Sequence, residues 1–151
     1  MKKAGPAPAV LEVSSDPARL DVGLIHEYLA RESYWARDIP RATLERALAH
    51  SLCFGAYLQG AQVGFARVVT DQATFGYLAD VFVVESQRGR GHARTLLERV
   101  FADARLQGLR RVLLATRDAH GLYAGFGFTP LAAPVRIMER HDPAVYSRPP
   151  G

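Results

Sequence analysis

One stretch of the sequence, residues 80–93, limits the possible folds more than any other. It runs DVFVVESQRGRGHA, so an apolar segment leads into a loop with two glycines and two arginines. Behind the loop, apolar residues recur at the spacing of one helix face, at Ala93, Leu96, Leu97, Val100, Phe101 and Ala104. This order predicts a buried strand, a tight loop and a long amphipathic helix that ends by Gly108.

The loop has the chemistry of an anion site. Glycines let the backbone turn tightly and bring its N–H groups close to a ligand, and the unpaired N–H groups at a helix start favour an anion. Arg88, Arg90 and Arg94 add positive charge. We predict a phosphate or pyrophosphate site; the alternative is an ordinary strand-to-helix turn with solvated arginines. The Gly-Lys-Ser/Thr of a P-loop is missing, and Arg94 replaces the third glycine of the dinucleotide fingerprint.

The remaining patterns predict an α/β fold. Helices are expected to start at Asp16-Pro17 and at Ile39-Pro40, and a short helix is expected near 121–125. Strands are expected over residues 10–13, 52–58, 63–70, 74–84, 111–115 and 135–138. Short turns predict an antiparallel meander first, and the long helix predicts a later strand–helix–strand crossover. We expect a single domain over 10–146 with flexible tails over 1–9 and 147–151.

Composition excludes several classes of protein. The one cysteine, Cys53, excludes an internal disulfide framework and a cysteine-based zinc site, and its place in a strand suggests a small core residue. No apolar run approaches the ~20 residues that cross a bilayer, and the first residues lack the apolar centre of a secretory signal. We therefore expect a cytoplasmic protein with no membrane contact and no bound metal. The net charge of +4 is spread along the chain, which gives weak support for nucleic-acid binding.

Two motifs are similar to those of a known family. Residues 88–93, RGRGHA, fit an R-x-x-G-x-A pattern, and residues 122–128, LYAGFGF, fit an L-Y-x-x-x-G-F pattern. In motif order and spacing, residues 52–138 resemble the GNAT superfamily of N-acetyltransferases. The resemblance implies a mixed, mostly antiparallel central sheet with N-terminal helices, a long cofactor-binding helix and a short C-terminal helix. It also implies acetyl-CoA as the co-substrate and no metal.

The same resemblance assigns the cofactor contacts. The backbone of Phe82, Val83 and Val84 is implied to pair with the pantetheine arm. The pyrophosphate is implied to lie on the loop and the first helical turn, at Arg88, Gly89, Arg90, Gly91, His92, Ala93 and Arg94. Thr116 stands where many members of the family have a cofactor-binding asparagine, so the sequence departs from the pattern there.

The catalytic roles also follow from the resemblance. Tyr123, in the second motif, would lie beside the thioester sulfur, and a phenol with a pKa of about 10 can donate a proton to a departing thiolate. Attack requires a deprotonated amine, and Asp80, which interrupts an apolar strand, is the preferred base. The alternatives are an Asp80 that is paired with Arg67, a water relay, or another base among Glu85, Asp118 and His120. A backbone N–H near Val83 is expected to meet the oxyanion.

The acceptor is expected to be a primary amine on a small molecule or a peptide. Tyr34 and Trp35, in the N-terminal stretch that forms one pocket wall in the family, are candidate substrate-binding residues together with Asp71. We expect direct transfer in a ternary complex. The alternatives are a non-catalytic acyl-CoA sensor and a basic nucleic-acid-binding domain. The region after Phe128 is short for the family's usual final pair of strands, and a homodimer is a further expectation.

Overall fold

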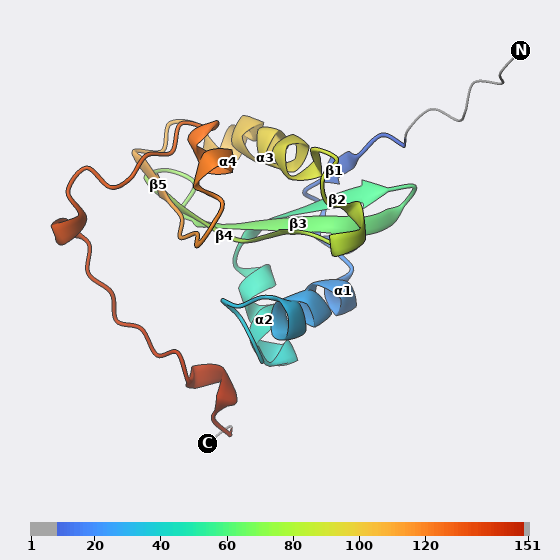
Figure 1. Cartoon of the computed structure of the whole chain (residues 1–151), viewed down its shortest axis with the longest axis horizontal. Coiled ribbons are helices and arrows are strands. Elements are labelled where there is room, and N and C mark those ends of the chain that lie inside the picture. Colours follow the sequence, from blue (N-terminus) through green and yellow to red (C-terminus); the bar gives the residue numbers. More distant parts are fainter. Residues whose placement is uncertain (1–8, 150–151) are drawn as a thin grey trace, which may run out of the picture.

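The computed structural model describes residues 9–149, which form one five-stranded sheet in the order β1-β2-β3-β4-β5 (Figure 1). The strands are β1 (Glu12–Ser14), β2 (Leu52–Leu58), β3 (Ala61–Thr70), β4 (Phe75–Val83) and β5 (Arg111–Leu113). Neighbouring strands are antiparallel except for the parallel pair of β4 and β5. The predicted meander, crossover and mostly antiparallel sheet are confirmed. Of the expected tails over 1–9 and 147–151, residues 1–8 and 150–151 lie outside the described residues.

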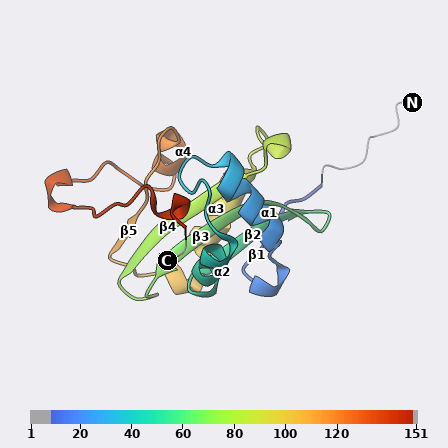
Figure 2. The same cartoon turned by 90° about the horizontal axis from the view of Figure 1, so that it is seen from below.

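Helices cover both faces of the sheet. The described α-helices are α1 (Val22–Glu27), α2 (Arg41–Ala49), α3 (His92–Ala102) and α4 (His120–Ala124). Figures 1 and 2 show α1 and α2 on one face and α3 and α4 on the other. The predicted apolar stripe forms the buried side of α3, where Leu96, Leu97 and Val100 are fully buried. None of the helices in residues 9–149 is long and apolar enough to cross a membrane.

Each face of the sheet has its own hydrophobic core. The core under α3 contains Val13, Phe54, Ala56, Ala66, Val68, Leu78, Leu96, Leu97, Val100 and Tyr123. The core under α1 and α2 contains Ile25, Tyr28, Leu29, Ala36, Ile39, Leu44, Cys53, Phe65 and Phe82. Successive strand residues alternate between the two cores, as Phe65 and Ala66 do. Because both faces are covered, open functional groups lie at the edges and ends of the strands.

The helix predicted to begin at Asp16 starts later. Asp16 caps only a 3₁₀ turn, Pro17–Arg19. Asp21 then caps α1 by accepting a hydrogen bond from the backbone N–H of Leu24 at 3.0 Å. The side chain of Gln62 accepts a bond from the Asp21 N–H at 2.7 Å and fixes the break between the two segments. A second aspartate cap and a contact from β3 therefore moved the helix start.

The strand predicted over residues 135–138 is wrong. The turn Pro134–Arg136 is a 3₁₀ turn, and Val135 and Met138 are each 92% exposed, so the segment does not alternate into a core. Proline also lacks the N–H that a strand ladder needs. Beyond this turn the chain runs outside the body and returns to the α1 side, where Tyr146 packs (Figure 2). β5 is therefore an edge strand of the sheet.

Candidate active site

The strands β4 and β5 pair over a short length and then separate. Only Phe75, Gly76 and Tyr77 of β4 pair with β5, whereas β4 continues to Val83. Val83 lies opposite Gly64 in a non-hydrogen-bonded pair. The neighbouring bond, from the Val84 N–H to the Val63 carbonyl at 2.8 Å, identifies the pair as this type. The N–H and C=O of Val83 therefore point to the edge that β5 does not cover. This edge is open to an extended ligand.

The loop between β4 and α3 adjoins the open edge. Gly89 and Gly91 have φ angles of 77° and 80°, a left-handed conformation that costs most other residues roughly 1–2 kcal/mol. Gly91 directly precedes α3, and no side chain of the described residues caps this helix. A Cβ atom on either glycine would meet nothing within 4 Å. The first N–H groups of α3 therefore have no side-chain cap among residues 9–149, and the space beside Gly89 and Gly91 is open, as an anion site requires.

The three arginines of the loop region differ in their contacts. Arg88 donates from Nε to the Val83 carbonyl at 3.0 Å and from its terminal nitrogen to the Tyr28 hydroxyl at 2.7 Å. It therefore fastens the loop to β4 and to the helix layer below. Arg90 and Arg94 are exposed and pair with no carboxylate among residues 9–149. Their charges are available to an anionic ligand.

The backbones of Phe82 and Val84 are turned to β3, where Phe82 lies opposite Phe65 and the Val84 N–H donates to the Val63 carbonyl at 2.8 Å. The predicted cofactor contacts of these two residues, and of His92 and Ala93, stay predictions. Phe82 is 4% exposed, and its ring stacks on that of Tyr28 with the centroids 3.9 Å apart. Val84 follows the end of β4 at the entrance to the loop. His92 and Ala93 form the first turn of α3, and the His92 Nε2 atom is buried without a hydrogen-bond partner in the described part of the chain.

Tyr123 lies on α4 and packs into the core under α3. It is 9% exposed, and its ring meets that of Phe128 edge-on with the centroids 6.0 Å apart. Burial, with a smaller contribution from the nearby Tyr34 hydroxyl, raises the pKa of Tyr123 above its ordinary value of 10.0. The phenol is therefore protonated across the neutral range and can donate a proton.

Asp80 occupies a β-bulge in β4. Phe65 and Arg67 of β3 pair with Phe82 and Ala79, so one intervening residue of β3 faces two of β4. The bulge gives Asp80 a φ of 58°, in the left-handed region. Aspartate tolerates this conformation better than most side chains do. The bulge changes the direction of the Asp80 side chain, and no pattern in the sequence predicted it.

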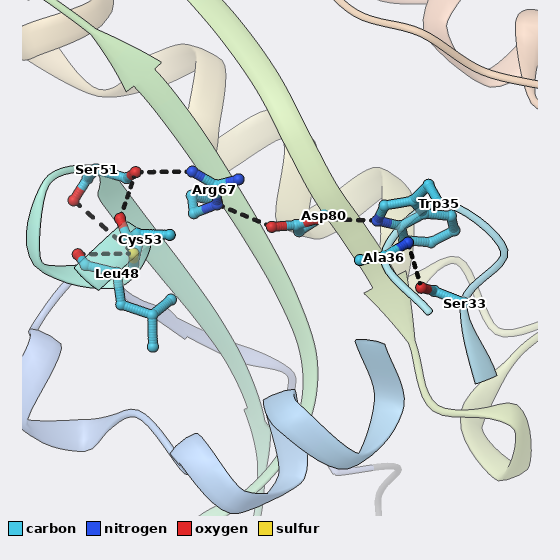
Figure 3. Close-up of polar contacts among 9 residues, drawn as sticks. Ser33, Trp35, Ala36, Leu48, Ser51, Cys53, Arg67 and Asp80 are labelled. Atoms are coloured by element: carbon cyan, nitrogen blue, oxygen red, sulfur yellow. Dashed lines mark hydrogen bonds and ion pairs between the residues drawn. The ribbon is translucent and has the colours of Figure 1, made fainter. Parts of the chain in front are cut away.

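Two donors hold the Asp80 carboxylate (Figure 3). Arg67 donates from Nε to Oδ2 at 2.8 Å, and Trp35 donates from Nε1 to Oδ1 at 2.8 Å. The side chains of Asp80 and Arg67 are 9% and 17% exposed. The pairing with Arg67, which was the alternative to a catalytic base, is therefore present. The role of Asp80 as the base stays a prediction.

Tyr34 and Trp35 lie beside Asp80, in the segment between α1 and α2. They are 46% and 41% exposed, and their rings meet edge-on with the centroids 5.0 Å apart. The Tyr34 hydroxyl accepts a hydrogen bond from the Arg117 N–H at 3.1 Å, and the Arg117 guanidinium lies 4.0 Å from the centre of the Tyr34 ring. The structure therefore brings both aromatic residues to the separated ends of β4 and β5. Arg117 was not predicted from the sequence.

Asp71 is not brought to this site. It precedes β4, at the opposite end of the strand from the glycine loop. Its carboxylate accepts bonds from the Thr74 hydroxyl and from three successive backbone N–H groups, which hold the pKa of Asp71 well below its ordinary value. The residue shapes the turn between β3 and β4.

The remaining candidates lie in turns around the site. The Thr116 hydroxyl accepts a bond from the Ala119 N–H at 3.0 Å and so shapes the approach to α4. His120 begins α4, Asp118 precedes it, and Glu85 begins a 3₁₀ turn after β4. No group of three His, Cys, Asp or Glu side chains in residues 9–149 is placed to hold a metal ion.

We expect Cys53 to react slowly with thiol reagents in the folded protein. It is 6% exposed, and burial raises the pKa of its thiol to about 11. At pH 8 only about one thiol in a thousand would then be ionised, and the thiolate is the reactive form. Maleimide labelling at pH 8 should be at least about 100-fold slower in the folded protein than in guanidinium chloride. Equal rates would contradict the buried, inert cysteine.

Comparison with protein families gives a match over most of the chain. The model of the acetyltransferase (GNAT) family matches residues 22–128. This range begins with α1 and ends with the last residue of the second sequence motif. It contains the glycine loop, the open edge of β4 and Tyr123.

Individual relatives agree with the family match. The candidate acetyltransferase FG08082 of Gibberella zeae is 37% identical over 74% of this chain and 74% of its own length. A candidate GNAT-family acetyltransferase from Xanthomonas campestris has a crystal structure with a TM-score of 0.90, 54% identity and coverage of 92% of this chain and 98% of its own. The chloroplastic serotonin N-acetyltransferase 2 of Oryza sativa is 35% identical over 72% of this chain, which spans 56% of that protein.

Proposed function

Because the chain belongs to the GNAT family of acetyltransferases, we propose that it transfers an acetyl group from acetyl-CoA to a primary amine by direct attack in a ternary complex. One observation supports this most strongly. The uncovered edge of β4 leads directly into the glycine loop and the uncapped start of α3. An extended pantetheine arm and a pyrophosphate fit this sequence of an open strand edge and an anion site.

The described residues fit acetyl-CoA in charge and in shape. Gly89 and Gly91 leave open space where a side chain would stand, and the exposed Arg90 and Arg94 supply positive charge. The backbone C=O of Val83 faces the edge at which a pantetheine amide would pair, and the Val83 N–H on the same edge is left for the thioester carbonyl oxygen. Acetyl-CoA supplies the activated thioester for the reaction.

In this proposal the amine nitrogen forms a bond to the acetyl carbon as the carbon–sulfur bond breaks. The Val83 N–H donates to the carbonyl oxygen as that oxygen gains charge. Tyr123 donates its phenolic proton to the departing sulfur and is reprotonated from solvent. The amine gives up one proton before attack, and Asp80 or a water relay as the acceptor of that proton stays a prediction. The nitrogen loses a second proton to solvent as the amide forms.

The acceptor side supports an amine carried on an aromatic or apolar group. Tyr34 and Trp35 expose their rings beside the site, and aromatic faces bind both apolar groups and organic cations. A relative at 35% identity is named as a serotonin N-acetyltransferase, and serotonin is such an amine. We therefore propose arylalkylamines as the first acceptor class to test.

The test measures CoA release with a thiol reagent while acetyl-CoA and one candidate amine are present. The candidate amines are phenethylamine, spermidine, an aminoglycoside and a lysine peptide. We expect release that depends on the amine and is fastest with phenethylamine. Acetyl-CoA binding without amine-dependent release would indicate the non-catalytic sensor instead. Salt-sensitive DNA binding in place of acetyl-CoA binding would indicate the nucleic-acid alternative.

We expect Arg88→Gln to raise the acetyl-CoA Kd about tenfold, because the loop loses a charge and two hydrogen bonds from a charged donor. These bonds join the loop to the Val83 carbonyl and to the Tyr28 hydroxyl. Tyr28→Phe is the matched control, since it removes only the bond between Arg88 and the Tyr28 hydroxyl. It should change the acetyl-CoA Kd less than about threefold. Calorimetric titration measures both. An unchanged acetyl-CoA Kd in Arg88→Gln would show that the two hydrogen bonds of Arg88 do not order the loop.

The domain limits 10–146, a cytoplasmic location and a homodimer also stay predictions. The cofactor contact expected of Thr116 and the acceptor contact expected of Asp71 are also still predictions. Asp71 is the weakest of these, because its carboxylate is occupied by the turn that it forms.

A further inference from the structure

A continuous chain of polar contacts runs across the sheet to Trp35 (Figure 3). The Ser51 hydroxyl accepts a bond from the Arg67 terminal nitrogen at 3.0 Å, and the Arg67 Nε donates to Asp80 at 2.8 Å. The other oxygen of Asp80 accepts the indole N–H of Trp35 at 2.8 Å. Ser51 is itself anchored, because its hydroxyl donates to the Ala47 carbonyl of α2 at 2.7 Å. Each end of this chain is therefore fixed to a different element.

The segment that bears Trp35 is fixed at its base by buried hydrogen bonds, whereas its aromatic side chains are partly exposed. Ser33 is 1% exposed; its hydroxyl donates to the Leu29 carbonyl at 2.6 Å and accepts the Ala36 N–H at 3.1 Å. Tyr34 and Trp35 project outward from this base and are nearly half exposed. Free exposed rings would sample several rotamers. The bond to Asp80 selects one orientation of the Trp35 indole.

The two aromatic residues contact both strands where β4 and β5 have separated. Trp35 bonds to Asp80, three residues beyond the last paired residue of β4. Tyr34 accepts the N–H of Arg117, four residues beyond the last paired residue of β5. Tyr34 also lies close enough to Tyr123 to influence its ionisation. The pair therefore bridges the opening at the end where the proposed general acid lies.

We propose that Arg67 and Asp80 are positioning residues, which hold Trp35 and its neighbour Tyr34 as a fixed wall for the acceptor amine. This inference rests on the proposed acetyltransferase function and deepens it. It gives Asp80 a role through Trp35 and not through the amine proton. The buried ion pair keeps the carboxylate in place as an acceptor for the indole, and the bulge in β4 aims it there.

The first arm of the test needs no substrate, because Trp35 is the single tryptophan of the chain. Its fluorescence anisotropy and acrylamide quenching report the indole alone. Arg67→Lys and Asp80→Asn should lower the anisotropy and raise the quenching constant about twofold, since the contact that fixes the indole orientation is weakened. The matched control is Arg105→Lys, which alters another Arg–Asp pair, with Asp103, away from Trp35. Unchanged fluorescence in both Arg67→Lys and Asp80→Asn would overturn the proposal.

The second arm separates positioning from proton transfer by steady-state kinetics. With phenethylamine as the acceptor, Trp35→Phe, Arg67→Lys and Asp80→Asn should each raise the amine KM about three- to tenfold. The acetyl-CoA KM and kcat should stay within about twofold. The Trp35→Phe/Asp80→Asn double variant should be no worse than Trp35→Phe alone, because both changes act on the same contact between Trp35 and residue 80.

A catalytic base would give the opposite result. Asp80→Asn would then lower kcat and remove the acidic limb of the pH profile of kcat. Its loss of activity would add to that of Trp35→Phe in the double variant. Such a result would overturn the positioning role. Unchanged circular dichroism and acetyl-CoA Kd in each variant serve as folding checks. An inactive wild type would reject the proposed function and the acceptor role with it. The fluorescence arm would still decide whether the ion pair holds Trp35.

Discussion

Replacing Tyr123 with phenylalanine is expected to lower kcat on the order of 10²-fold, the lower end of what a positioned general acid contributes. The substitution removes only the hydroxyl, so the ring keeps its packing in the core under α3 and its edge-on contact with Phe128. The thiolate would then leave without a proton donor. Acetyl-CoA binding should change little, because the loop and the β4 edge are untouched. Stopped or continuous thiol-release assays, with calorimetric binding in parallel, measure the two effects separately.

The pH dependence of the wild type gives a second check on Tyr123. Burial raises the pKa of the phenol above 10.0, so its acid form persists through neutral and mildly alkaline pH. Activity should therefore show no loss from Tyr123 deprotonation below about pH 10. The matched control is Tyr77→Phe at the far end of β4, where the side chain is 38% exposed and kcat should stay unchanged. If Tyr123→Phe keeps wild-type kcat, the hydroxyl is not the acid.

Replacing Gly91 with glutamate is expected to weaken acetyl-CoA binding about 100-fold. A carboxylate about 5 Å from a pyrophosphate charge costs roughly 3 kcal/mol at an effective dielectric constant of 20, and each 1.4 kcal/mol changes Kd about tenfold. The new side chain has open space, since nothing lies within 4 Å of its Cβ position. The loss should therefore come from charge and from the φ of 80°, and not from a steric clash.

Two further variants separate those causes. Gly60 has a φ of 83° and equally open surroundings in the turn between β2 and β3. Gly60→Glu thus imposes the same backbone strain and charge away from the loop, and should leave the acetyl-CoA Kd unchanged. Gly91→Ala imposes strain alone and should weaken binding less than Gly91→Glu does. Equal affinity for acetyl-CoA in wild type and Gly91→Glu would place the anion site elsewhere.

Much of the fold follows from local patterns in the sequence. The three strands of the meander are long, apolar and separated by short turns, so their existence and their antiparallel order could be predicted. The apolar stripe predicted the long helix α3, and Gly89 and Gly91 predicted the tight loop before it. These features depend on residues that are neighbours in the chain. The strand expected over 135–138 failed because a short apolar run does not specify burial, and Pro134 begins a turn there.

The geometry of the site depends on pairing between distant segments, which is why it was not predicted. β5 was expected to reach residue 115 but ends at Leu113, so its pairing with β4 stops at Tyr77. The bulge at Asp80 arises only when β3 and β4 pair in their actual register. The bond from Trp35 to Asp80 spans 45 residues of sequence. The lone aspartate in an apolar strand did identify Asp80 as unusual, but did not identify its partners.

Direct transfer from acetyl-CoA to an amine can be tested by following the acetyl group itself. The purified protein is incubated with isotopically labelled acetyl-CoA and phenethylamine, and both the amine and the protein are analysed by mass spectrometry. We expect labelled N-acetylphenethylamine, no labelled protein, and a strong decrease in product with Tyr123→Phe. Label retained on the protein would contradict direct transfer. An unlabelled amine across the whole acceptor panel, despite bound acetyl-CoA, would contradict the acetyltransferase function.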